Sequence, residues 1–185
     1  MTAVWDSFAS IMFLNPTHLI SALKIQKGDY VADFGAGHGH FAIPLAERVG
    51  GDGRVWALDI NRHAIDIIRR EARLRHLVNI HPVWTDIEAA AGSGLKENFM
   101  DVAVAANLLH QCRDGAALFR EAGRILHEDG RLLVVEWSPE SVIGPPRELR
   151  IPPGLAAAMA RAAGFTIADE HPAGQCHYAL EFRKR

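Results

Sequence analysis

The sequence predicts an α/β fold in which a mostly parallel sheet carries helices on both faces. Short apolar runs alternate with longer segments of helical periodicity through most of the chain. Two more strand-like runs lie close together near the C-terminal end, separated by residues 172–174, and so short a connection joins antiparallel strands only. We therefore expect one sheet whose last strand runs against the others. A chain of 185 residues suits a single domain.

The first half of the chain is expected to begin with helical residues 2–24, interrupted at Asn15 and Pro16. Apolar residues recur at helical spacing between residues 61 and 76, and glycines at residues 50–53 indicate a loop. The predicted strands of this half are residues 30–34, 54–58 and 79–84, and its other predicted helix is residues 38–49.

The second half continues the alternation and ends in a hairpin. Residues 89–98 are predicted as a loop. The continuous apolar run of residues 102–106 is typical of a strand that is buried on both faces. Residues 128–130 form a predicted turn, and residues 139–153 a proline-rich connection. The other predicted elements are helices at residues 115–127 and 154–163 and strands at residues 131–137, 165–170 and 176–183.

Composition and charge exclude several classes of protein. The net charge is -2 and the pI is about 6.5, so we expect no nucleic-acid partner. Cys112 and Cys176 are the only cysteines and have no metal-finger spacing, which disfavours a disulfide scaffold. No run of about 18 apolar residues is present, so no membrane span is expected. Without a recognisable secretory signal, the expected location is cytoplasmic.

A glycine-rich stretch directly follows the first predicted strand. Gly35, Gly37 and Gly39 allow a tight turn and close approach of a ligand. Ligands of open α/β sheets bind beyond the carboxyl ends of the strands, where this loop would lie. A dinucleotide fingerprint would place glycine at His40, and Asp33 would repel a pyrophosphate. The same carboxylate would attract an ammonium or sulfonium group.

Two more acidic residues end the next two predicted strands. Asp59 follows Gly39 by 20 residues, a spacing at which an acidic side chain accepts hydrogen bonds from ribose hydroxyls. Asp86 ends the third strand, where an acceptor can receive the exocyclic amine of adenine. Helix capping by Asp59 and surface capping by Asp86 remain alternatives. Together the three carboxylates describe a ligand with adenine, ribose and a cationic amino-acid end.

Five segments of the chain resemble those of the class I S-adenosylmethionine-dependent methyltransferases. They are VADFGAGHGHF, VWALDIN, VWTDIE, DVAVAANLLHQCRD and GRLLVVEW. The resemblance spans about residues 23–183 and is closest to the ubiquinone/menaquinone-biosynthesis and arsenite methyltransferase-like group. It implies a three-layer Rossmann-like fold with a seven-stranded sheet of order 3-2-1-4-5-7-6 and an antiparallel last strand. Residues 1–24 would form a helical cover and residues 25–185 the catalytic core of a single methyltransferase domain, 1–185.

The resemblance also implies a cofactor, S-adenosylmethionine, and its product S-adenosylhomocysteine. Asp59 would bind the ribose, Asp86 and Ile87 would border the adenine, and Asn107 would lie near the amino-acid end. The full set of expected cofactor-binding residues is Asp33, Gly35, Ala36, Gly37, His38, Gly39, Asp59, Ile60, Asp86, Ile87 and Asn107. His38 and His40 have no further partner at ligand spacing, so no metal is expected.

Topology places a second group of residues at the same edge of the sheet. His110 and Cys112 follow the fourth strand and Trp137 the fifth. Because the last strand is antiparallel, its first residues also face this edge. His110 and His177 are the candidate catalytic residues, since histidine can accept a proton near neutral pH. A purely structural role remains an alternative for each of three residues. His110 would cap the next helix, His177 would face solvent, and Trp137 would pack in the core. The expected substrate pocket comprises Trp5, Cys112, Trp137 and Tyr178, with Phe8 and Cys176 nearby.

The predicted function is methyl transfer from S-adenosylmethionine to a small-molecule acceptor by in-line displacement. The methyl group is already activated, so the protein mainly supplies positioning and a dry pocket. Arsenite as acceptor is disfavoured, because two cysteines fall short of the thiol cluster that such relatives use. The alternatives are a methyltransferase acting on a protein or nucleic acid, and a non-catalytic S-adenosylmethionine-binding module. A nicotinamide oxidoreductase is disfavoured by Asp33 and His40. A homodimer is a further possibility.

Overall fold

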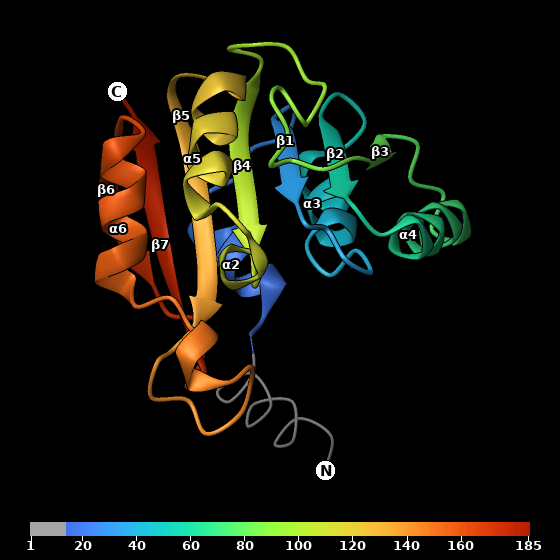
Figure 1. Cartoon of the computed structure of the whole chain (residues 1–185). Coiled ribbons are helices and arrows are strands. Elements are labelled where there is room, and N and C mark those ends of the chain that lie inside the picture. The colour runs from blue at the N-terminus through green and yellow to red at the C-terminus, as the bar shows by residue number, and fades with distance from the viewer. Residues whose placement is uncertain (1–13) are drawn as a thin grey trace.

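The computed structural model describes residues 14–185, which form a seven-stranded sheet with helices on both faces (Figure 1). The strand order is β3-β2-β1-β4-β5-β7-β6, and β7 runs antiparallel to both of its neighbours. The predicted fold class and strand order are therefore confirmed. The strands are β1 (Tyr30–Phe34), β2 (Arg54–Asp59), β3 (Ile80–Trp84), β4 (Met100–Ala106), β5 (Leu126–Trp137), β6 (Phe165–His171) and β7 (His177–Lys184).

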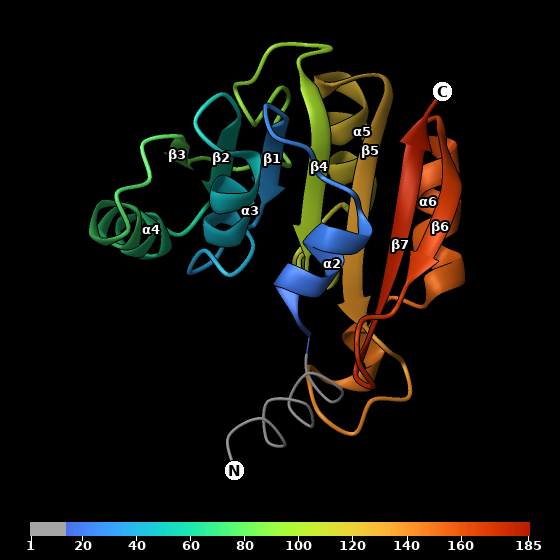
Figure 2. The ribbon, with the colours of Figure 1, turned by 180° about the vertical axis from the view of Figure 1, so that it is seen from behind.

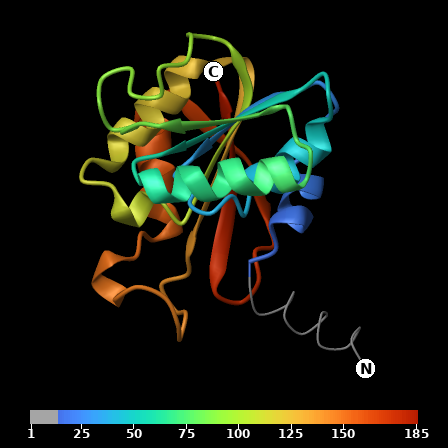
Figure 3. The same cartoon turned by 90° about the vertical axis from the view of Figure 1, so that its right-hand side faces the viewer.

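The helices divide between the two faces of the sheet. Helices α2 (Pro16–Ala22), α3 (Ala42–Val49) and α4 (Arg62–Leu74) cover one face, which is nearest the viewer in Figure 2. Helices α5 (Gly115–Ile125) and α6 (Pro153–Ala162) cover the other. Figure 3 shows the helical layers on either side of the sheet from its β3 edge. Each layer buries its own apolar cluster against the sheet, as a three-layer fold requires.

The central strands explain why the sequence shows continuous apolar runs. Alternate residues of β4 point to opposite faces, so Val102 and Val104 enter one cluster while Ala103 and Ala105 enter the other. All four are fully buried. Short connections after β4 and β5 contain the 3₁₀ helices η1 (Leu109–Gln111) and η2 (Arg147–Leu149). Both lie beyond the carboxyl ends of the strands, at the lower end of the sheet in Figure 1.

The predicted helix at residues 38–49 begins later than expected, at Ala42. Gly37 and Gly39 have φ values of 52° and 87°, which are incompatible with a right-handed helix. The glycine loop therefore extends to Phe41, the N-cap residue, and Pro44 falls within the first turn, where proline is tolerated. The prediction failed because His38, Gly39 and His40 were assigned to the helix, although they belong to the loop that precedes it.

The predicted turn at residues 128–130 is also wrong, because these residues lie within β5. Met100 pairs with Leu126 and Val102 with Arg131, so the register shifts between these two positions. Asp129 adopts a φ of 64° at this irregularity. Helix α5 consequently ends at Ile125, two residues before the predicted end. Leu126 is fully buried, and its packing extends the strand past residues that favour a turn.

The N-terminal segment is described from Leu14 onward. Asn15 caps α2 by accepting a hydrogen bond from the backbone N–H of His18 at 3.2 Å, and Pro16 occupies the first helical position. Trp5 and Phe8, expected near the substrate, lie outside the described residues. The division into a cover and a core therefore stays a prediction. Among residues 14–185, no helix has the length and apolar character needed to cross a membrane.

Candidate active site

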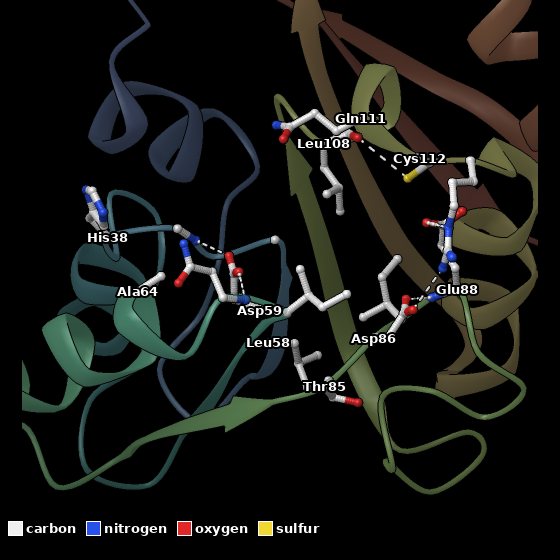
Figure 4. Close-up of a pocket in the computed structure, with 16 residues that line it drawn as sticks. His38, Leu58, Asp59, Ala64, Thr85, Asp86, Glu88, Leu108, Gln111 and Cys112 are labelled. Atoms are coloured by element: carbon white, nitrogen blue, oxygen red, sulfur yellow. Dashed lines mark hydrogen bonds and ion pairs between the residues drawn. The ribbon is translucent and has the colours of Figure 1, made fainter.

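A pocket of about 610 Å³ lies at the carboxyl ends of β1, β2, β3 and β4 (Figure 4). Loops that follow these four strands supply its walls. In Figure 4, His38 and Asp59 lie on the opposite side from Leu108, Gln111 and Cys112. The pocket is lined by Gly35, Gly37, His38, Leu58, Asp59, Ile60, Asn61, Ala64, Thr85, Asp86, Ile87, Glu88, Leu108, Gln111, Cys112 and Arg113.

The three loop glycines have different surroundings, although all have positive φ. Gly35 faces Leu108, whose Cδ1 would lie 2.7 Å from an added Cβ. Gly37 is open, with its nearest non-neighbouring atom 4.0 Å from such a Cβ. At Gly39 an added Cβ would meet Ile43 at 3.1 Å and Ile68 at 3.2 Å, outside the pocket. Gly35 and Gly37 therefore shape the pocket wall, while Gly39 allows close packing behind it.

Asp59 fastens the glycine loop to the end of β2. Its Oδ2 accepts the backbone N–H of Gly37 at 2.8 Å, and its Oδ1 accepts that of Asn61 at 2.7 Å. Asn61, not Asp59, is the N-cap of α4, since its side chain accepts from the N–H of His63. Each carboxylate oxygen of Asp59 has a further lone pair. The side chain can therefore accept hydroxyl donors from a ligand in the pocket.

Asp86 belongs to a charged network on the far wall. Its Oδ1 accepts the N–H of Glu88 at 3.0 Å, and its Oδ2 accepts from Arg113 at 3.0 Å. Arg113, which also lies 3.5 Å from Glu88, was missed by the sequence analysis because its partners precede it by more than 20 residues. Ile60, with 64% of its surface exposed, and the buried Ile87 both line this pocket. These two side chains offer apolar contact to a flat ring.

Two buried acceptors at the ends of neighbouring strands lack donors. Within the described part of the chain, Asp33 Oδ2 and Asn107 Oδ1 have no hydrogen-bond partner. Burial raises the pKa of Asp33 to about 8; the N–H of Ala42 opposes this shift and the charge of Asp59 adds to it. Asn107 has a φ of 54°, a left-handed conformation that asparagine tolerates. Acceptors without donors fit a ligand that carries an ammonium group.

A second polar cluster lies beyond β4 and β5. His110, on η1, directs Nδ1 to Glu136 Oε2 at 2.8 Å, and its backbone N–H donates to Glu136 Oε1 at 3.2 Å. The N–H of Trp137 also donates to Oε2 at 3.2 Å. Glu136 is fully buried. Glu136 was not among the predicted site residues, although a carboxylate at the end of an apolar strand needs a partner when it is buried.

His177 begins β7 opposite Trp137 in the strand register. The two rings lie 4.1 Å apart between centroids at an angle of 35°. His177 is 9% exposed, and neither ring nitrogen has a partner among the described residues. Burial lowers the pKa of His177; Glu136 opposes this and His110 adds to it. Trp137 also packs against Gly144, where an added Cβ would lie 2.5 Å from the indole ring.

The other expected substrate residues have defined partners. Tyr178 donates its hydroxyl to the carbonyl of Ile151 at 2.8 Å, which ties the connection after β5 to β7. Cys112 lines the pocket and donates to Leu108 at 3.5 Å; burial raises the pKa of its thiol to about 12. Cys112 is thus a thiol, not a thiolate, at neutral pH. Cys176 is buried.

The pocket therefore unites many of the expected residues, but not all. It brings together seven expected cofactor residues and Cys112. Asp33, Ala36, Gly39 and Asn107 lie outside its lining, as do the acceptor-side residues His110, Trp137, His177 and Tyr178. Residues 14–185 contain no cluster of three or more side chains suited to hold a metal ion. The members of the expected set that line the pocket are Gly35, Gly37, His38, Asp59, Ile60, Asp86, Ile87 and Cys112.

Residues 25–161 match the sequence family described as a methyltransferase domain. The ubiquinone/menaquinone biosynthesis C-methyltransferase UbiE of Neisseria meningitidis is 35% identical over 136 residues, which cover 73% of this chain and 49% of that protein. The demethylmenaquinone methyltransferase of a Geobacillus species is 25% identical over 122 residues, covering 66% and 51%. The matches thus span about half the length of these relatives.

Solved structures share the fold. A SAM-dependent methyltransferase from Aquifex aeolicus superposes with a TM-score of 0.86 at 18% identity, covering 96% of this chain and 93% of that one. The match to the family begins at residue 25, ahead of β1, and ends at residue 161, within α6, and so includes the whole pocket. The chain therefore belongs to the class I S-adenosylmethionine-dependent methyltransferases, in the group related to UbiE.

Proposed function

We propose that the chain is an enzyme that transfers a methyl group from S-adenosylmethionine to a small-molecule acceptor by in-line displacement. The main support is the kind of polar group found at the edge of the sheet beside the pocket. A dinucleotide site would offer donors to phosphate there, whereas this chain offers carboxylates and hydrogen-bond acceptors without partners. When bound, S-adenosylmethionine supplies an electrophilic methyl group. The protein orients the reactants and excludes water.

The described residues suit each portion of this cofactor. Asp33 and Asn107 present buried acceptors that an amino group would satisfy. Asp59 presents a carboxylate to ribose hydroxyls, held in place by the Gly37 and Asn61 N–H groups. Ile60 and Asp86 offer apolar and polar contacts to adenine. His38, at the mouth of the glycine loop, also lines the pocket.

We further propose that the acceptor is a hydroxylated ring of the quinone class and that the methyl group goes to carbon. The support is the UbiE relative, whose name gives it a C-methyltransferase activity in quinone biosynthesis. The polar cluster beyond β4 and β5 also contains His110 and His177, whose ring nitrogens can accept protons from such a ring or donate protons to it. Arsenite stays disfavoured as the acceptor, because Cys112 and Cys176 are too few for the thiol cluster that such a substrate needs.

Calorimetric titration tests the cofactor. S-adenosylmethionine and S-adenosylhomocysteine should bind, and NAD should not. Asp59→Ala should weaken S-adenosylhomocysteine by about 2 kcal/mol, roughly 30-fold, because hydrogen bonds to a charged acceptor are worth about 1.5–3 kcal/mol. Asp52→Ala, in an exposed loop, is the matched control and should leave affinity unchanged. Equal affinity of wild type and Asp59→Ala would remove Asp59 from the site.

Methyl transfer is then measured with radiolabelled S-adenosylmethionine on cell extract separated by size. Label should appear in the small-molecule fraction. Label confined to protein or nucleic acid would favour the macromolecular alternative. Cofactor binding with no transfer to any fraction would favour a binding module without catalysis.

A further inference from the structure

The Glu136 carboxylate is fully buried at the end of β5, yet no lysine or arginine of residues 14–185 forms an ion pair with it. It receives two backbone N–H groups and the Nδ1 side of His110. A buried carboxylate is costly unless its charge is compensated by hydrogen bonds or a cation. His110 is thus the one described side chain that stabilises this charge by direct contact.

The Glu136 contact determines the state of the His110 ring. An ionised carboxylate can only accept hydrogen bonds, so Nδ1 must carry a proton. In the neutral ring, Nε2 then holds a free lone pair and can accept a proton. Nε2 makes no hydrogen bond within the described residues, and the His110 side chain is 10% exposed. Glu136 therefore orients His110 so that its Nε2 can act as a proton acceptor at the edge of the sheet.

His177 supplies a second, independent observation. Its ring is held against Trp137, so the orientation is fixed by packing. It is nine-tenths buried, and both nitrogens lack partners among residues 14–185. Burying a ring with two polar atoms and no hydrogen bond costs free energy. Such a residue fits a ligand that completes its hydrogen bonds.

We infer that Glu136 is a positioning residue that holds His110 as the base for a hydroxyl of the acceptor ring, and that His177 contacts a second polar atom of the same acceptor. This inference rests on the proposed function and deepens it. It restricts the acceptor to rings with an ionisable hydroxyl next to the carbon that is methylated. Trp137 sets the orientation of His177, and its close packing on Gly144 holds the indole in place.

The hydroxyl proton moves to His110 Nε2, and the freed oxygen electrons extend into the ring. The adjacent ring carbon bonds to the methyl group while the carbon–sulfur bond breaks, with its electron pair remaining on sulfur. The ring carbon then loses its own proton to water, and His110 returns the first proton to the oxygen. One proton is released overall.

The charged and titratable groups around this site come from three segments. Glu136 lies on β5, His110 and Cys112 lie on or beside η1, and His177 and Tyr178 lie on β7. Burial raises the pKa of Tyr178 above its ordinary value, and Glu136 adds to the shift. Tyr178 and Cys112 therefore stay neutral near pH 7 and leave the proton transfer to the histidines.

The first test needs neither cofactor nor acceptor. Long-range ¹H–¹⁵N spectra of histidine-labelled full-length protein, recorded at about pH 8, report which ring nitrogen carries the proton. His110 is assigned by the signal that disappears in His110→Gln. We expect the Nδ1–H form in wild type and the Nε2–H form in Glu136→Gln, whose amide can donate to Nδ1. An Nε2–H ring at His110 in wild type would overturn the inference.

The matched control is Glu181→Gln. Glu181 is also buried and also pairs with a histidine, His171, at 2.7 Å, but it lies outside the proposed acceptor site. Both variants replace the carboxylate of a buried histidine–glutamate contact by an amide. Glu181→Gln should leave the His110 tautomer unchanged, which separates positioning from a general loss of stability.

The second test uses two probes, 1,4-naphthohydroquinone and 1,4-dimethoxynaphthalene. The latter has the same ring but no hydroxyl proton. We expect methylation of the first probe only. Glu136→Gln should lower kcat roughly 100-fold with little change in KM, the magnitude of a general base, whereas Glu181→Gln should keep wild-type kcat. Equal methylation of both probes, or equal kcat in the two variants, would overturn the inference. Failure of wild type to bind S-adenosylmethionine would instead overturn the proposed function.

Discussion

Asp33 shows how one residue can be destabilising and useful at once. Its carboxyl group is 2% exposed, one oxygen has no partner within residues 14–185, and burial raises its pKa to about 8. In the ligand-free protein the group is therefore mostly protonated at neutral pH. A bound ammonium group would favour the charged form, so its binding should release a proton. Asp33 thus links cofactor binding to pH.

This shift predicts the pH dependence of stability. The pKa of Asp33 is higher in the folded protein than its ordinary value of 3.8. The contribution of Asp33 to the free energy of unfolding is therefore fully present below pH 3.8 and is lost as pH rises through about 8. The free energy of unfolding should fall by up to about 1.4 kcal/mol per pH unit over that window. Denaturant titrations of wild type and Asp33→Asn measure it: the difference between them should change with pH, while Asp52→Asn should parallel wild type. A constant difference across the window would contradict the raised pKa.

At the scale of single residues, functional side chains could be predicted where a local sequence pattern marks them. Asp33 and Asp59 stand at the ends of apolar strands, Asp33 directly before the glycine loop, and their positions follow from the parallel sheet. Arg113 and the partner of Glu136 could not be identified from the sequence, because both depend on residues distant in the chain. Glu136 meets His110 across 26 residues, and Arg113 meets Asp86 across 27. No local spacing reports such pairs.

At the scale of elements, the glycine loop carries two separate functions. Gly37 has an open surrounding and lines the pocket, whereas Gly39 is packed against Ile43 and Ile68. Sequence reasoning could recognise the loop but not this division, since the three glycines look equivalent. It also misplaced the start of α3 and the turn after α5. In both cases packing decided between two locally acceptable conformations.

The division predicts opposite phenotypes for two alanine variants. Gly39→Ala should destabilise the fold by about 2–3 kcal/mol, from left-handed strain plus crowding by Ile43 and Ile68. Gly37→Ala should cost only about 1–2 kcal/mol, from strain alone, but should weaken S-adenosylhomocysteine more strongly. Chemical denaturation and calorimetry separate the two effects. Gly28→Ala, with a φ of 91° and open surroundings, controls for strain. A larger loss of affinity in Gly39→Ala than in Gly37→Ala would contradict the division.

At the scale of the molecule, β7 determines what meets at the edge of the sheet. Because β7 runs against β5, its first residue, His177, lies beside Trp137, at the same edge as the ends of β4 and β5. This meeting was predicted from topology alone, whereas the full strand order was implied by the family resemblance. The pocket and the meeting of His110, Glu136 and His177 thus depend on pairing between strands that are distant in the sequence.

The pocket joins loops from β1, β2, β3 and β4, so a ligand there should stabilise the whole fold. S-adenosylhomocysteine at about 100 times its dissociation constant should raise the free energy of unfolding by about 2.7 kcal/mol, and Tm by about 5–10 °C for a chain of this size. Asp59→Ala, tested at the same concentration, should lose most of the increase because it binds more weakly. Differential scanning calorimetry measures both. NAD should produce no shift, and stabilisation by NAD equal to that by S-adenosylhomocysteine would show that the carboxylate-lined edge does not select against phosphate.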